Sequence, residues 1–164
     1  MIPEISRPLA LDRVGPAGLA LLVEADPAEL PAVAARLGVH AVHALRCDFR
    51  LRRIGGAVIE AQGDLVVSLT QQCVVSLDGF DGLVRDRFLV HFVPAGTEDE
   101  EPEPDAPDQI PFEGSAVDLG EAAVEQLALA LDPYPRRPGA ELPAAASDAP
   151  LGAFAALGAL RPKQ

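Results

Sequence analysis

Arginines in the first half of the chain are the residues best suited to a chemical task, the binding of phosphate groups. Arg46, Arg50 and Arg52 stand at even positions of a segment whose odd positions are apolar, and Arg53 follows directly. Side chains two residues apart on a strand share one face at a spacing of about 7 Å, comparable to the spacing of phosphates along RNA. A planar guanidinium binds phosphate oxygens through two hydrogen bonds at once. These four residues are therefore candidate RNA- or phosphate-contacting residues.

The same arginines fit a second interpretation, a solvated sheet face that Asp48 and cross-strand acids such as Glu60 neutralise. Aromatic residues make up only 4% of the chain, so side chains on which single-stranded bases could stack are scarce. The formal net charge of −12 also opposes nucleic-acid binding. However, seven acidic residues lie between Glu98 and Asp108 in a run without a basic residue. Without them 18 acids face 13 bases, so a local basic face is compatible with the composition.

Residues that could catalyse a reaction or bind a metal are few. His40, His43 and His91 do not have the spacing of a histidine metal motif, and no serine belongs to a GxSxG motif. Neither a P-loop nor a GxGxxG motif is present. Cys47 and Cys73 are best interpreted as small buried hydrophobic residues. We therefore predict a protein that is not an enzyme and has no catalytic residue, metal or cofactor, whereas a hydrolase would require a deep polar pocket around the histidines.

The elements that carry the arginines are predicted to be strands of an antiparallel meander. Apolar residues alternate with polar ones from Leu45 to Leu51, and Ile54-Gly55-Gly56 predicts a reversal. The next run is apolar at odd positions up to Leu69, with Gly63 as a bend or bulge. After a turn at residues 78–82, alternation from Val84 to Phe92 predicts a further strand that Pro94 ends.

Helices are predicted on either side of these strands. Residues 4–14 look extended, and a helix over about 27–37 would be capped by Asp26 and have an irregular first turn at Pro31. Residues 119–131 predict an amphipathic helix, with Asp118 as its cap and Glu121 completing a capping box. Its apolar stripe consists of Leu119, Ala123, Leu127 and Leu131, widened by Val124 and Ala128, and Pro133 and Pro135 end it.

These elements predict an α+β fold, an antiparallel meander that is partly barrel-like and packs with two or three helices. Residues 1–164 form one domain in this interpretation, with an acidic flexible loop at about 95–109 and an irregular stretch at about 138–150. Leu151, Phe154, Leu157 and Leu160 recur every three residues and predict a short final helix. The chain lacks an 18-residue apolar run and the pattern of a secretory signal, so we expect no membrane contact and a cytoplasmic location.

The segment DLGEAAVEQLALALDPYPR, from Asp118 to Arg136, resembles the helix and exit of the YceD family, bacterial proteins tied to large-subunit ribosomal RNA accumulation. The order of elements resembles the family from about residue 5 to 140, including QQCVVSLDGF and FLVHFVP. The closing APLGAFAALGAL is similar to the family's ending. Many members carry two cysteines near Cys73 and a further cluster after the proline exit. This chain has only Cys73 there, so a four-sulfur zinc site cannot be assembled, and it resembles the metal-free α-proteobacterial branch.

The resemblance implies a non-enzymatic ribosome-biogenesis factor that supports accumulation or processing of large-subunit ribosomal RNA. Its partners would be that RNA or a precursor particle, reached directly or through ribosomal proteins. In this light the exposed candidates for partner binding at the helix exit are Glu125, Gln126, Tyr134 and Arg136, although packing over the helix end is favoured for Tyr134. The alternative is a protein-interaction module that binds a basic partner through the acidic loop and helix exit, without RNA contact. Oligomeric state stays open.

Overall fold

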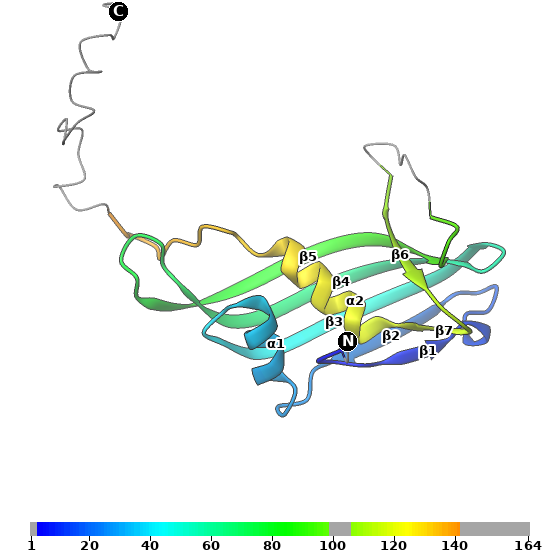
Figure 1. The fold of residues 1–164 in the computed structure, drawn as a ribbon, viewed down its shortest axis with the longest axis horizontal. Helices are drawn as coiled ribbons and strands as arrows, with labels where there is room; N and C mark the ends of the chain where they lie inside the picture. The colour runs from blue at the N-terminus through cyan, green and yellow to red at the C-terminus, as the bar shows by residue number, and fades with distance from the viewer. Residues whose placement is uncertain (1–2, 99–105, 142–164) are drawn as a thin grey trace, which may run out of the picture.

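The computed structural model describes residues 3–98 and 106–141. A five-stranded sheet has the order β2-β3-β4-β5-β6, and β1 and β7 form a separate two-stranded sheet (Figure 1). The elements in chain order are β1 (Pro8–Ala10), η1 (Leu11–Arg13), β2 (Leu19–Glu24), α1 (Leu30–Leu37), β3 (Ala41–Gly55), β4 (Val58–Gln72), β5 (Gly79–Pro94), β6 (Asp108–Phe112), β7 (Ala116–Asp118) and α2 (Leu119–Ala130). The α+β class is confirmed. The five-stranded sheet is mixed, because β6 is parallel to β5, and it is not closed into a barrel.

The meander of β3, β4 and β5 is the predicted antiparallel one. The reversal between β3 and β4 lies at the predicted glycines, where Gly56 adopts a φ of 51° that favours glycine. Two further strands were not expected. β2 pairs with β3 in a segment that had no strand prediction, and β6 begins where the predicted acidic loop ends and pairs in parallel with the end of β5. Both are short edge strands, which depend on the neighbouring strand more than on their own residues.

Both predicted helices form, with differences at their first turns. α1 begins at Leu30, later than predicted, and its N-cap is Glu29 without a side-chain hydrogen bond, not Asp26. Asp118 does cap α2, since its carboxylate accepts hydrogen bonds from the amides of Gly120 and Glu121. Glu121 does not complete the capping box. Its carboxylate instead accepts two hydrogen bonds from Arg36 at 2.7 and 2.8 Å, which joins α2 to α1.

The core lies between the five-stranded sheet and the elements on one side of it. Figure 1 shows α1, α2 and the β1–β7 pair on the same side of the long strands, and α2 contacts β4, β5, β1 and β2. The apolar side chains of α2 from Leu119 to Leu127 are buried there, whereas Ala128 is exposed, so the buried stripe is narrower than predicted. The other side of the sheet has no covering element among the described residues, so it is open to solvent.

Gly63 is not a bend or bulge, because it pairs in regular register with Phe49 on β3 and Phe88 on β5. The rings of Phe49 and Phe88 meet edge to face over this glycine, with centroids 5.7 Å apart. A Cβ atom at Gly63 would lie 2.1 Å from Cζ of Phe88. The glycine therefore makes room for an aromatic pair in the core.

No helix within residues 3–98 and 106–141 is long and apolar enough to cross a bilayer. The predicted helix over residues 151–160 lies outside the described residues, as do most of the predicted irregular stretch and residues 99–105 of the acidic loop.

Candidate nucleic-acid interface

The open face of the sheet carries three of the four arginines singled out from the sequence. From Leu45 to Leu51 the odd-numbered residues of β3 point into the core, so Arg46, Arg50 and Arg52 point to solvent from the opposite face. Their side chains are 52%, 68% and 67% exposed. The strand's alternation is thus sufficient to place these three residues on one accessible surface.

Arg53 has a different environment from the other three. It lies within β3, opposite Ile59, and not in the turn. Its guanidinium donates hydrogen bonds to the carbonyl oxygens of Gly56 at 3.0 Å and Leu11 at 2.6 Å. These bonds tie the β3–β4 hairpin to η1. Arg53 therefore has a structural role and does not belong with the arginines of the open face.

Two arginines on β5 join the open face, and sequence reasoning did not select them. Val66 of β4 lies between Arg46 on β3 and Arg85 on β5 in one cross-strand row, and Asp64 lies opposite Arg87 in the next row. The signal was present in the sequence, because an apolar face at Val84, Phe88 and Val90 implies a second face at 85 and 87. Only the register between strands shows that these residues adjoin the arginines of β3.

The carboxylates on this face are unevenly shared among the arginines. Arg46 forms two hydrogen bonds with Asp48, which raise its pKa, and Arg52 pairs with Glu60 at 2.7 Å. These contacts fit the interpretation of a neutralised sheet face. In contrast, Asp64 forms ion pairs with two arginines, one on β3 and one on β5.

Asp64 lies 2.6 Å from Nε of Arg87 and 3.6 Å from Nη1 of Arg50. Arg85 forms no ion pair with a residue in the described part of the chain, and it is exposed. Two guanidinium groups therefore contact this carboxylate, and a third, that of Arg85, lines the same hollow. We call Arg50, Arg85 and Arg87 the Asp64 arginine cluster, because Arg50 and Arg87 contact Asp64 and Arg85 lies in the neighbouring cross-strand row.

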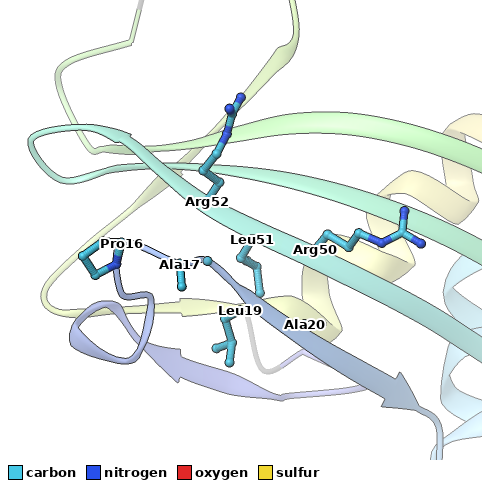
Figure 2. A pocket seen from close by; sticks show the side chains of 8 residues that line it. Pro16, Ala17, Leu19, Ala20, Arg50, Leu51 and Arg52 are labelled. Carbon is cyan, nitrogen blue, oxygen red and sulfur yellow. The ribbon is translucent and has the colours of Figure 1, made fainter.

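The surface around the cluster has shallow relief and exposed leucines. A hollow of about 440 Å³ lies between Asp64–Val66 and Arg85–Arg87, and another of about 290 Å³ lies between residues 16–20 and Arg50–Arg52. Figure 2 shows Arg50 and Arg52 extending from β3 in different directions at the second hollow. Leu22, Leu83 and Leu89 are also exposed. Such a surface can contact an extended polyanion, whereas one small anion would need guanidinium groups that converge.

The histidines do not surround a deep polar pocket in the described structure. His43 Nε2 lies 2.8 Å from Thr70 Oγ1, which in turn donates to Asp81 at 2.5 Å, and all three side chains are on the surface. His40 and His43 border a hollow of about 620 Å³ along α1 whose other lining is almost entirely apolar. No group of three or more His, Cys, Asp or Glu side chains within residues 3–98 and 106–141 could hold a metal ion.

A comparison with protein families connects this geometry to a known group. The family model described as large ribosomal RNA subunit accumulation protein YceD matches residues 61–152, more than half of the chain. The chain belongs to the YceD family. Comparisons with curated proteins and with solved structures found no match. The YceD match includes Arg85 and Arg87 but begins after the arginines of β3.

The helix exit of this YceD chain differs from the sequence prediction at two residues. Gln126 is buried, with 6% of its surface exposed, so it is not an exposed candidate for partner binding. Gln126 is buried because neighbouring elements cover a wider part of the α2 surface than its apolar stripe. Tyr134 is 71% exposed, and the packing favoured for it is wrong. Glu125 is half-buried. Its pKa is raised mainly by burial and secondly by the negative charge of the nearby Glu121. Arg136 is exposed, as predicted.

Cys73 joins the two segments that most resemble the YceD family. Its buried sulfur accepts hydrogen bonds from the amides of Ser76 at 3.5 Å and Arg137 at 3.4 Å. Hydrogen bonds from the Ser76 side chain and then from these amides lower the pKa of Cys73 to about 6. Val74 donates to the carbonyl of Pro135, so the β4–β5 turn holds the exit segment. Because the sulfur of Cys73 already accepts hydrogen bonds from two backbone amides, this junction does not fit a sulfur-ligated metal.

The second cysteine lies far from this junction. Cys47 is opposite Leu65 of β4, and Cys73 follows eight residues after Leu65, about 26 Å along the strand. Burial raises the pKa of Cys47 to about 12. The sequence interpretation of two buried, unpaired cysteines is therefore confirmed, but only Cys47 behaves as a plain core residue.

Proposed function

We propose that this protein is a cytoplasmic, non-enzymatic ribosome-biogenesis factor that contacts large-subunit ribosomal RNA, or a precursor particle, through the open sheet face. The family name links the protein to accumulation of that RNA. The observation that carries direct contact is the Asp64 arginine cluster, in which Arg50 and Arg87 share one carboxylate and the neighbouring Arg85 is exposed without an ion pair to a described residue. Phosphate is the ligand that exposed, incompletely paired arginines bind most readily.

Binding of this kind is expected to be weak and blind to base sequence. Phe49, Phe88 and Phe92 of the central strands are buried, so these three rings cannot stack with bases. Contacts would be limited to the phosphate backbone, which positions a protein without reading sequence. Selection of the correct RNA would then come from additional contacts with the precursor particle, including its proteins.

The decisive experiment reverses charge at two cluster residues and leaves the Asp64–Arg87 ion pair in place. We expect Arg50→Glu with Arg85→Glu to abolish retention of large-subunit RNA by the purified protein, because the local charge changes sign. The matched control is Arg13→Glu with Arg136→Glu, which changes net charge equally at exposed sites away from the cluster. Retention is measured by gradient co-sedimentation and by RNA pull-down, with circular dichroism as the test of folding.

The possible outcomes separate two kinds of failure. Unchanged RNA retention by the cluster variant would contradict direct contact through this face. Unchanged large-subunit RNA levels in a deletion strain would contradict the role in accumulation itself. Loss of RNA only in the control variant would instead favour the helix exit as the contact site.

A protein-interaction module is the second candidate, and the exposed helix exit favours it. Leu129 and Tyr134 are 70% and 71% exposed, and a hollow of about 390 Å³ beside them is lined by Val74, Leu131 and Pro135 among others. Large apolar side chains in such positions often mark a protein contact. Pull-down from lysate with and without nuclease distinguishes the candidates, because a protein partner bound at Tyr134 would survive nuclease and be lost in Tyr134→Ala.

A further inference from the structure

The outer edge of β5 is free over most of its length. β6 pairs with β5 only from Val90 to Pro94, so no described strand adjoins the segment from Gly79 to Leu89 (Figure 1). On that side half of its backbone N–H and C=O groups point away from β4. A long free edge is a template for pairing with another strand, and it is usually blocked by charged side chains.

The charges on this edge are complementary when two copies of the strand run antiparallel. In an antiparallel pairing centred on Val84, Asp81 would lie opposite Arg87 of the second copy on the open face. Leu83 would lie opposite Arg85, whose aliphatic stem can cover it while the guanidinium stays in solvent. On the covered face Val84 would meet Val84, and Asp86 would meet Gly82. Opposite charges and apolar contacts thus coincide in one register.

Other registers are less favourable. A shift by one residue would turn every side chain to the wrong face, so only shifts by two residues need comparison. A shift one way places Arg85 opposite Arg85 and Asp86 opposite Val84. A shift the other way keeps an attractive pair, Arg85 opposite Asp81, but places half-buried Asp86 opposite Phe80. The register centred on Val84 avoids both a like-charge pair and an acid against an apolar side chain.

We propose that two copies of this chain pair antiparallel through β5, from Asp81 to Arg87, and join their sheets into one. Asp81 is available for this contact, since its side chain is 82% exposed. Arg87 holds Asp64 through Nε, which leaves its terminal nitrogens for Asp81 of the second copy. The open faces of the two copies would then form one longer surface, although pairing does not depend on RNA binding.

The test measures the mass of the full chain by sedimentation equilibrium at about 0.15 M salt, where long-range repulsion is screened. We expect the average mass to rise from 17.2 kDa towards twice that value with concentration. Asp81→Arg should weaken association about tenfold or more, because two attractive pairs become repulsive. Asp12→Arg changes net charge equally at an exposed site in η1 and should leave association unchanged.

A cysteine crosslink tests the register. Val84→Cys should form an intermolecular disulfide under mild oxidation, because opposite Cβ atoms lie about 5 Å apart. Leu89→Cys should not, since the two copies of residue 89 would be about 30 Å apart. A mass of 17.2 kDa at every concentration, association that Asp81→Arg does not weaken, or equal crosslinking at both positions would overturn the proposal.

Discussion

At the scale of single residues, the packing of this protein depends on positions that a sequence pattern describes poorly. Gly63 belongs to the apolar face of β4 by position, and a larger residue would suit that face in most sheets. Here Phe88 occupies the space over it and meets Phe49 edge to face. Arg53 shows the same limit, because its guanidinium turns to backbone carbonyls that no local pattern identifies.

Replacement of Gly63 by alanine should be costly despite its small size. The new methyl group would lie 2.1 Å from Cζ of Phe88, so the ring and its partner must move. We expect a loss of about 1–3 kcal/mol in the free energy of unfolding, measured by denaturant titration. Gly55→Ala is the control, since nothing lies within 4 Å of the added methyl group, and its effect should stay within about 0.5 kcal/mol. Equal effects of the two changes would contradict this account of the core.

At the scale of elements, Asp118 shows how one predicted helix is held in place. Besides the amides of Gly120 and Glu121, its carboxylate accepts hydrogen bonds from Ser6 Oγ at 2.6 Å and the amide of Arg7 at 2.8 Å. The same group therefore starts α2 and fastens the N-terminal segment to it. The capping pattern predicted the first role, but the contact with Ser6 and Arg7 spans more than 110 residues of sequence and has no local signal.

Substitution of Asp118 tests this double role. Asp118→Ala removes the helix cap and leaves the Arg7 amide without its acceptor, so we expect a loss of about 2–3 kcal/mol in unfolding free energy. Asp118→Asn keeps an oxygen acceptor and a polar partner for Ser6, so its cost should be below about 1 kcal/mol. Thermal and denaturant unfolding measure both values. A stable alanine variant would show that α2 is held by apolar burial alone.

At the scale of the whole molecule, the distribution of charge matters more than its sum. The net charge is −12, yet the open face carries five exposed arginines from β3 and β5, of which Arg50 and Arg87 share one carboxylate and Arg85 pairs with none of the described residues. A chain that is acidic overall can thus present a local site for a polyanion. Its affinity should fall as salt rises, because each phosphate contact releases counterions from the ligand.

The salt dependence of RNA binding gives a count of the phosphates contacted. With three or four contacts to single-stranded RNA, the slope of log affinity against log salt concentration should be about −2 to −3. In the double variant Arg50→Glu with Arg85→Glu, the slope for any residual binding should be shallower, about −1. Fluorescence titration at several salt concentrations measures it. A slope near zero in the natural sequence would contradict phosphate contact altogether.

Period-two alternation and capping residues were sufficient to predict the β3–β4–β5 meander, both helices and the exposed side of Arg46, Arg50 and Arg52. These features depend on contacts within one strand or one helical turn, and such contacts involve residues that are close in the sequence. The placement of Arg85 and Arg87 beside Asp64, the burial of Gln126 and the junction at Cys73 were decided only by tertiary structure. Each depends on the register or packing of segments far apart in the chain, because a local pattern shows which face a side chain takes but not what lies across from it.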